Sequence, residues 1–473
     1  PENGKDIVTT LDVNVQDITQ TALMRMMISN EALEGCAIVM EVATGKIKAI
    51  ANLGRMPDGS YFETDNYALK TSEPGSIIKL VTLLSVLEDK YVTTSDMIDI
   101  NNGSWMLNGR NIRDAEKSPK SLLTIKESFE HSSNVAMAKL AYTYYSKNPA
   151  QFIKHYEALH LTARTGIDLK EEFRPLVKNP SRKDWHLQTL PSMGFGYEVM
   201  LSPLQLLMVY NAVANEGKLM KPYLVNRVEK DGNLLHEFEP QVLNNNICSE
   251  ETLRQLKDCL DAVCIQGTAK SIFKDAVYHA AGKTGTTKVN DGKFKYGDAV
   301  YQSSFAGYFP AENPKYSCIV VIKNKPRAAK YFGGAVAAPV FREIADKLYA
   351  ESADRQQLFI AKAATDSNKY RWSGYGSELK NVLETMNVQY TDSITSGKWG
   401  VVTNNAYTPL LKDLSISKQT VPDVKGMGLK DALHLLENMN IKVTVKGKGK
   451  VTSQSLDAGL AINTGQTMAL ELN

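Results

Sequence analysis

The segment from Ser76 to Glu88 constrains the fold more than any other part of the sequence. Aliphatic side chains occupy most of its positions, so a helix here has little surface that could face water: Ile77, Ile78, Leu80, Val81, Leu83, Leu84 and Leu87. The preceding pair Pro74-Gly75 breaks any earlier helix and sets the start of this one. We therefore expect a central helix that is surrounded by protein. This run is far shorter than the ~20 residues that span a bilayer, and we predict no membrane-spanning helix in the chain.

Helices and strands are predicted on both sides of this central helix. Three- and four-residue apolar spacing indicates helices, and short apolar runs separated by turn residues indicate antiparallel strand pairs. The helices are expected over residues 15–27, 123–130, 135–145 and 337–348, and the strand pairs over 36–41 with 47–51 and over 301–309 with 316–323. Helices at both ends with strands between them predict an α+β fold, in which helices flank a mostly antiparallel sheet.

The pattern changes twice toward the C-terminus, which predicts three regions. Residues 1–352 form the main domain. In residues 353–420, Ser, Thr, Asn, Asp and Gly separate short apolar segments, which indicates a partly structured connector. Residues 421–473 regain a regular pattern of strand, helix over 430–439 and further strands, and we expect a small βαββ domain near the lower size limit for independent folding.

Composition excludes several classes of function. Lys and Arg total 55 against 52 Asp and Glu, a net charge of +3, so no excess of basic charge indicates a nucleic-acid partner. The five cysteines and seven histidines show no paired metal-ligand spacing. We therefore predict no metal and no cofactor. The sequence begins at Pro1 without Met or a leader-like apolar stretch, and we expect a fragment whose native start was removed.

The Ser-x-x-Lys pattern at the start of the central helix can carry nucleophilic chemistry. The pattern occurs four times, at 76/79, 271/274, 377/380 and 415/418, and only Ser76 begins a strongly apolar helix. There Ser76 and Lys79 share one helix face, about 5 to 6 Å apart at Cβ. A serine needs a base to attack, and a lysine serves as one when burial or a second cation lowers its pKa.

Two further motifs are ambiguous when taken singly. Ser132 to Asn134 has the spacing Ser-x-Asn, but Ser146 to Asn148 has it too, and a helix cap is the commoner explanation of either. The segment Lys283-Thr284-Gly285-Thr286 is the only Lys-Thr-Gly in the chain. Its cation and hydroxyls on an extended strand could hold a carboxylate, with Gly285 allowing close approach to the backbone; an ordinary surface strand is the alternative.

Together the three motifs resemble a known family. Ser-x-x-Lys, Ser-x-Asn and Lys-Thr-Gly in this order are the signature of penicillin-binding proteins and class A β-lactamases, with Ser133 in place of the aspartate of Ser-Asp-Asn. Five further stretches within residues 1–350 resemble the transpeptidase domain of class B penicillin-binding proteins: residues 7–12, 73–76, 202–205, 214–217 and 304–310. Residues 421–424, Gly426, 449–451 and Gln454 resemble a PASTA module, although Ser455 stands where that family usually has proline.

The resemblance implies a penicillin-binding-protein or β-lactamase-like fold and a D,D-transpeptidase that cross-links peptidoglycan stem peptides. It implies Ser76 as the nucleophile, Lys79 as its base, Ser132 as a proton relay, and Asn134 as a hydrogen-bonding partner of Lys79 and the substrate. A second group of residues would bind the substrate: Lys283 by its positive charge, Thr284 and Thr286 by their hydroxyls, and Gly285 by close approach. β-Lactams would acylate Ser76.

The resemblance also implies a cellular location and partners, and it leaves two alternative functions open. We expect an extracytoplasmic protein, held to the plasma membrane by an N-terminal anchor absent from this chain, with cell-wall or division proteins as partners. Septation and elongation both stay open as its role, and the C-terminal module favours septation. The first rival is a β-lactamase, although the nearest Glu-x-x-Leu-Asn candidate, Glu239 before Leu243-Asn244, is one residue too long. The second rival is a non-catalytic β-lactam sensor or wall-binding protein.

Overall fold

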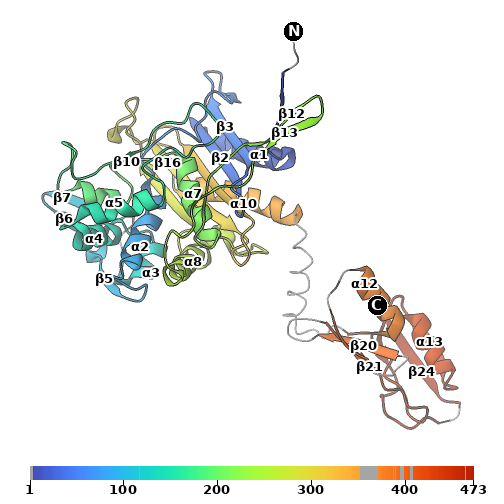
Figure 1. Cartoon of the computed structure of the whole chain (residues 1–473). Coiled ribbons are helices and arrows are strands. Elements are labelled where there is room, and N and C mark those ends of the chain that lie inside the picture. The colour runs from blue at the N-terminus through green and yellow to red at the C-terminus, as the bar shows by residue number, and fades with distance from the viewer. Residues whose placement is uncertain are drawn as a thin grey trace. The chain divides into compact units, whose positions relative to one another are not determined.

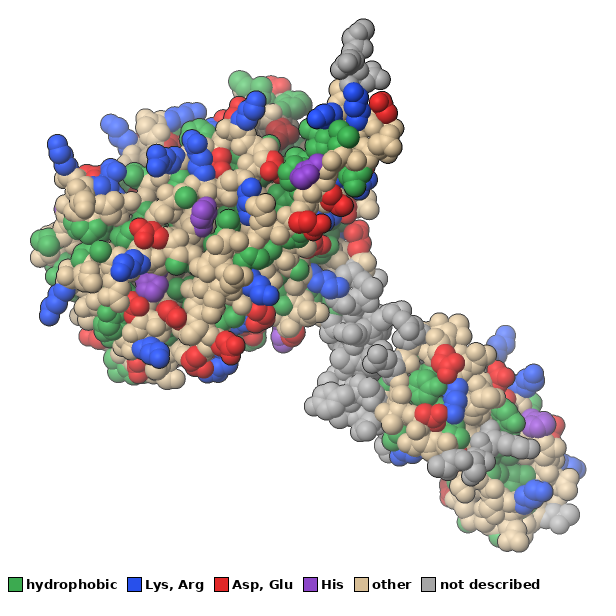
Figure 2. Space-filling view, in the orientation of Figure 1, with side chains coloured by type: hydrophobic (Ala, Val, Ile, Leu, Met, Phe, Trp, Pro, Cys, Tyr) green, Lys and Arg blue, Asp and Glu red, His purple; other side chains and the backbone are tan. Residues whose placement is uncertain are grey.

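The computed structural model describes residues 4–116, 118–351, 371–386, 388, 390–394, 399–404, 409–463 and 465–473. The chain divides into two compact units, residues 1–350 and 351–473. Figure 1 shows both units, with the large one running from blue to orange and the small one in red tones. In Figure 2, acidic and basic side chains are intermixed over the visible face, as the nearly balanced charge leads one to expect.

A six-stranded antiparallel sheet forms the centre of the large unit. Its strands follow the order β15-β16-β17-β2-β3-β4, so β15 lies at an edge. They are β15 (Ala281–Lys288), β16 (Tyr301–Phe309), β17 (Tyr316–Lys323), β2 (Glu34–Glu41), β3 (Ile47–Arg55) and β4 (Tyr61–Phe62). All of these pairings are antiparallel, which confirms the predicted α+β class.

Helices cover both faces of this sheet. On one face lie α1 (Val13–Ser29) and α10 (Gly333–Glu351), joined by an ion pair between Arg25 and Glu343. On the other face α7 (Pro203–Ala214) packs on β16 and β17, and its Asn211 accepts a hydrogen bond from Ser317 at 2.7 Å. Figure 1 shows this arrangement, with the sheet strands between the helices.

The remaining elements of the large unit surround this sandwich. The helices are α3 (Ile125–Glu130), α4 (Asn134–Tyr145), α5 (Pro149–Ala158), α6 (Thr189–Gly194), α8 (Glu250–Ile265) and α9 (Lys270–Phe273). The short strands are β1 (Asp6–Thr9), β5 (Met97–Asp99), β6 (Ser104–Leu107), β7 (Arg110–Arg113), β8 (Leu122–Thr124), β9 (Leu176–Val177), β10 (Val199–Met200), β11 (Leu219–Met220), β12 (Val225–Lys230), β13 (Asn233–Glu237) and β14 (Val242–Asn244). Among the described residues, no helix is long and apolar enough to cross a bilayer.

The predicted central helix is present, but it begins differently. Residues Gly75–Ile78 form a 3-10 turn, η1, and the α-helix α2 runs from Lys79 to Glu88. Every residue of α2 except Glu88 is buried, as its composition predicts. The predicted helix over 123–130 starts later, at Ile125, because Thr124 and Glu127 form a capping box that fixes its first turn.

The small unit contains two sheets that share the same arrangement of three strands after a helix. Its second part has α13 (Leu429–Glu437) and the strand order β22-β24-β23, with β22 (Lys442–Lys446) parallel and β23 (Val451–Gln454) antiparallel to β24 (Thr467–Leu472). Buried Val424, Met427, Leu436, Met468 and Leu470 belong to its core.

The segment predicted as a connector holds the other copy. Here α12 (Gly376–Thr385) precedes β19 (Thr391–Ser393), which is parallel to β21 (Pro409–Asp413). Strand β20 (Trp399–Asn404) is antiparallel to β21, and the leading strand β18 (Arg371–Tyr375) extends the sheet. The same backbone hydrogen bond forms after each helix: Val388 N donates to Leu383 O at 2.9 Å after α12, and Ile441 N donates to Leu436 O at 3.1 Å after α13.

Candidate active site

The Ser76 hydroxyl lies on a tightly packed turn. Gly75, immediately before it, has a φ of +60°, a conformation that glycine adopts without strain. Gly75 N donates to Gly196 O at 3.0 Å, and a Cβ on Gly196 would lie 2.1 Å from Gly75 O. The nucleophile turn and the segment through Gly196 are therefore in direct backbone contact.

The Lys79 side chain is fully buried one turn after Ser76. Its Nζ donates to Ser132 O at 2.6 Å, to Asn134 Oδ1 at 2.7 Å and to Ser132 Oγ at 3.2 Å. The structure thus brings the first two motifs together through this amine. Within the described part of the chain the Ser76 hydroxyl makes no hydrogen bond, and it faces the cavity described below.

Burial lowers the pKa of Lys79 to about 7, although the nearby charge of Asp114 acts in the opposite direction. Burial also lowers the pKa of Lys283 well below its ordinary value, and the proximity of Lys79 lowers it further. A proton on either amine therefore disfavours a proton on the other.

The Ser132 to Asn134 segment is a strained turn between two helices. Ser132 has a φ of +59°, and Ser133 is the N-cap of α4, accepting a hydrogen bond from Ala136 N at 3.0 Å. Asn134 Nδ2 donates to Arg113 O at 2.8 Å, which points its carbonyl oxygen toward Lys79. The helix-cap interpretation holds for the middle residue, Ser133, while its neighbours Ser132 and Asn134 contact Lys79.

The Lys-Thr-Gly segment lies on the edge strand β15. Lys283 is fully buried, and its Nζ donates to Thr284 O at 3.0 Å. The hydroxyls of Thr284 and Thr268 are 2.6 Å apart, and Thr286 Oγ1 accepts a hydrogen bond from Gly333 N at 3.0 Å.

Gly285 has a packing role that the sequence did not indicate. A Cβ there would lie 2.2 Å from Ser304 Oγ and 3.1 Å from Ile77 Cγ2. The missing side chain therefore lets η1 pack against β15. A ligand cannot approach Gly285 from the side on which a Cβ would lie, because Ser304 and Ile77 fill that space.

The motif residues meet at one cavity of about 820 Å³. Its wall includes Ser76, Ser132, Asn134, Thr284 and Thr286, whereas Lys79 and Lys283 lie buried behind it. Phe195 and Tyr197 add aromatic surface to the same wall. A serine hydroxyl, a largely desolvated amine and a pair of threonine hydroxyls in one cavity can support acyl transfer.

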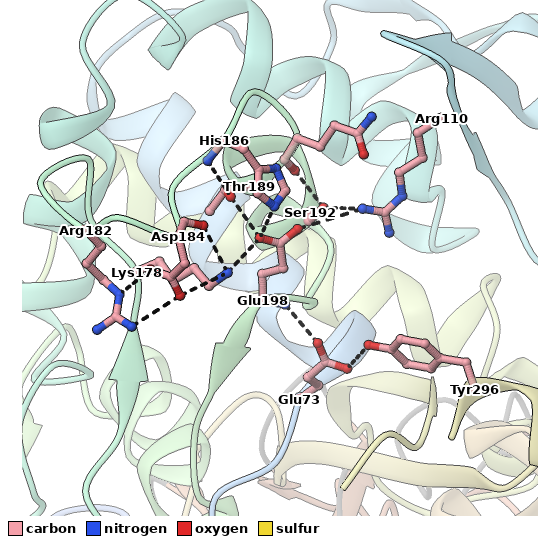
Figure 3. A network of polar contacts seen from close by, with 11 residues as sticks. Glu73, Arg110, Lys178, Arg182, Asp184, His186, Thr189, Ser192, Glu198 and Tyr296 are labelled. Carbon is pink, nitrogen blue, oxygen red and sulfur yellow. Dashed lines mark hydrogen bonds and ion pairs between the residues drawn. The ribbon is translucent and has the colours of Figure 1, made fainter. Parts of the chain in front are cut away.

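A polar network beside the nucleophile was missed by sequence reasoning. Figure 3 shows Glu73, three residues before Ser76, bridging two segments. Glu198 N donates to Glu73 Oε1 at 2.9 Å, and the Tyr296 hydroxyl donates to Glu73 Oε2 at 2.8 Å. Burial raises the pKa of Glu73 in spite of these hydrogen bonds. The position of Glu73 next to the nucleophile was the one available signal.

Glu198 continues the network away from the cavity. Its carboxylate accepts hydrogen bonds from Lys178 at 3.1 Å and Thr189 at 2.8 Å, with His186 and Arg110 within 4 Å (Figure 3). Burial alone would raise the pKa of Glu198, but these hydrogen bonds and positive charges lower it. Because Glu198 follows Gly196 and Tyr197, this network fixes the segment that contacts Gly75.

Comparison with known proteins decides the family. Residues 35–346 match the family model described as "Penicillin binding protein transpeptidase domain", and residues 419–473 match the PASTA domain. The chain belongs to the penicillin-binding protein transpeptidase family. Both resemblances inferred from the sequence are thereby confirmed.

Curated relatives carry names from cell-wall synthesis. The chain is 30% identical to "Peptidoglycan D,D-transpeptidase FtsI" of Buchnera aphidicola, over 72% of this chain and 58% of that protein. It is 28% identical to FtsI of Escherichia coli, over 72% and 55%. "Stage V sporulation protein D" of Bacillus subtilis aligns with 100% of the chain at 25% identity, over 66% of its own length. The chain thus spans a little over half of FtsI.

Solved structures share the transpeptidase fold. The transpeptidase domain of penicillin-binding protein 3 from Burkholderia pseudomallei superimposes with a TM-score of 0.62 at 27% identity, covering 73% of this chain and 96% of that one. The unliganded penicillin-binding protein 3 from Mycobacterium tuberculosis gives 0.64 at 27% identity, covering 74% and 80%. A second structure of that protein is a complex with aztreonam.

Proposed function

We propose that this chain is a peptidoglycan D,D-transpeptidase that cross-links stem peptides through an acyl-enzyme on Ser76, and that β-lactams inhibit it by acylating the same hydroxyl. One observation carries the proposal. The amine of Lys79, with a pKa near 7, contacts Ser132 and Asn134 at the wall of the cavity that contains Ser76. The names of the relatives support the substrate class.

The acylation step assigns Lys79 as the base. Two of its N–H bonds point to the Ser132 carbonyl and the Asn134 amide oxygen, which can only accept. In the neutral amine, the lone pair is therefore left for a hydroxyl proton. Ser76 Oγ attacks the carbonyl carbon between the two terminal D-alanines as Lys79 takes its proton. The C–N bond then breaks, and Ser132 passes a proton to the departing D-alanine nitrogen.

The opposite wall is assigned to binding and charge stabilisation. The hydroxyls of Thr284 and Thr286 would bind the terminal carboxylate, and the N–H groups of Ser76 and Thr286 would stabilise the oxyanion. Losing one such donor typically costs about 2.7 to 4 kcal/mol of barrier. A bound carboxylate would also favour the charged form of Lys283, whose pKa burial otherwise lowers.

The second half-reaction distinguishes the transpeptidase from its rivals. An amine from another strand attacks the acyl-enzyme, forms the cross-link and returns a proton through Lys79. A β-lactamase would need a base that activates water for attack on the acyl-enzyme. Glu239, the candidate from the sequence, is exposed and lies outside the cavity wall. The acidic side chains of that wall are Asp114, Glu116 and Glu127. A purely sensing protein would stop at the acyl-enzyme. We place this reaction on the extracytoplasmic side, with wall-synthesis or division proteins as partners.

Intact-protein mass spectrometry after incubation with penicillin tests the proposal. We expect one stable adduct per chain, mapped by peptide analysis to Ser76 and absent in Ser76→Ala. Rapid turnover of penicillin would favour the β-lactamase, and an adduct on another residue would contradict the assignment. Cross-linking of polymeric peptidoglycan by the wild type but not by Ser76→Ala separates the transpeptidase from a sensor.

A further inference from the structure

The middle motif lacks the aspartate of Ser-Asp-Asn, because Ser133 stands in its place. In the structure a carboxylate nevertheless reaches this position from a different segment. Asp114, one residue beyond β7, accepts a hydrogen bond from Ser133 Oγ at 2.8 Å through Oδ2. Its other oxygen, Oδ1, accepts one from Val135 N at 2.9 Å.

These contacts hold the residues on both sides of Asn134. The neighbouring Arg113 O accepts the hydrogen bond from Asn134 Nδ2 at 2.8 Å. Two adjacent residues, Arg113 and Asp114, therefore contact Ser133 and Asn134 of the turn and Val135 directly after it. The turn needs such support because Ser132 has a φ of +59°, in the left-handed region.

We propose that Asp114 is a positioning residue for acyl transfer, which fixes the Ser132 to Asn134 turn against Lys79 and supplies the negative charge that faces this lysine. The proposal deepens the proposed function, on which it rests. Asp114 lines the same cavity as Ser76, so its charge also lies at the substrate-binding surface. A carboxylate thus contacts the middle motif from the connection that follows β7.

The charges around Lys79 determine the direction of the effect. Lys283 faces it from β15 and Asp114 from the segment after β7. The cavity wall adds the exposed Glu116, Lys120 and His131 and the partly exposed Glu127. Asp114 favours the protonated form of Lys79, in opposition to burial. Removing its charge should therefore make the neutral amine available at lower pH.

Three variants separate charge from geometry. Asp114→Asn keeps an acceptor for Val135 N and can donate to Ser133 Oγ, so it removes the charge alone. Ser133→Ala keeps the charge and removes the hydroxyl, which also caps α4 through Ala136 N. Adding Ser133→Asp to Asp114→Asn returns the carboxylate to the motif position, and aspartate is as good an N-cap as serine.

The rate of acylation by penicillin is measured against pH for the full chain and each variant. An opposite charge nearby favours the charged form of an amine, so the loss of the Asp114 charge should shift the pKa of Lys79 downward. Asp114 is partly exposed, so solvent screening limits the size of this shift. In Asp114→Asn the acylation rate should begin to rise at a lower pH than in the wild type. In Ser133→Ala the rate should be lower, but its rise should begin at the wild-type pH. In the double variant the rise should again begin at the wild-type pH.

A second readout needs no reaction. NMR titration of isotope-labelled Lys79, assigned with Lys79→Arg, should show the same downward shift in Asp114→Asn and the same recovery. An unchanged titration of Lys79 in Asp114→Asn overturns the proposal, as does a shift of equal size in Ser133→Ala. If penicillin does not acylate the wild type, the proposed function fails, and the titration still decides the role of Asp114.

Discussion

Substituting Gly196 by alanine should displace the nucleophile without touching any motif residue. Gly196 has a φ of +99°, and its backbone faces Gly75. An added Cβ would lie 2.1 Å from Gly75 O and 2.5 Å from Gly75 Cα, whereas Cβ atoms essentially never come within 3.0 Å of another heavy atom. The two segments must therefore separate by about 0.9 Å, the difference between these distances.

This separation predicts the size of the effect on rate. Misplacement of a reacting group by about 1 Å can cost about 100-fold, so we expect acylation of Ser76 by penicillin to slow by about that factor. The positive φ adds about 1–2 kcal/mol of destabilisation for any side chain with a Cβ. Acylation should thus fall much more than the loss of stability alone would explain.

A control variant isolates the collision from the backbone strain. Gly232, in the hairpin between β12 and β13, has a φ of +78° and nothing within 4 Å of its Cβ position. Gly232→Ala should lower the melting temperature through backbone strain alone and leave acylation unchanged. Both are followed by thermal unfolding and by labelling with fluorescent penicillin. If Gly196→Ala is labelled at the wild-type rate, the contact with Gly75 does not position the nucleophile.

Three further predictions follow from the site. The acylation rate should rise with pH through about 7, because Lys79 must lose its proton to act as the base and its lowered pKa makes the neutral amine available above pH 7. A rate that stays constant between pH 5.5 and 8.5 would contradict this role. Glu73→Ala should leave Glu198 N, which is partly buried, without its acceptor, at a cost of about 1–3 kcal/mol if that group stays unsatisfied. Denaturant unfolding should show a larger loss of stability than for Glu73→Gln, which retains an acceptor oxygen. A fragment of residues 1–350 should be acylated at the rate of the full chain, since it is a compact unit by itself; a tenfold slower rate would show that residues 351–473 act on the site.

The sequence predicted best where one local pattern decides the structure. The strands over 301–309 and 316–323 have the predicted bounds, because the turn residues over 310–315 separate the two strands and fix where one ends and the next begins. The first turn of the central helix was predicted as α-helix. It is 3-10, because its geometry depends on packing against β15 and Gly196, which lie far away in the chain.

The parts that were missed depend on contacts between distant segments. Asp114 and Glu198 are ordinary carboxylates in sequence, and only the folded chain brings them to the Ser132 turn and to Glu73. Residues 371–413 were predicted as connector because polar residues separate their short apolar segments. A signal was present, since Leu383-Glu384 with Met386 repeats at Leu436-Glu437 with Met439, fifty-three positions later.

The contact between the two similar halves of the small unit determines what truncation or proteolysis would expose. Ser373 N donates to Gly426 O at 3.1 Å, and Ser373 also pairs with Met427 in a parallel bridge, so a backbone bridge joins β18 to the segment before α13. A protein trimmed to the 419–473 match would lose this bridge and leave Gly426 O without its donor. Such a piece would be prone to self-association, and proteolysis of the intact protein should release both copies as one resistant product.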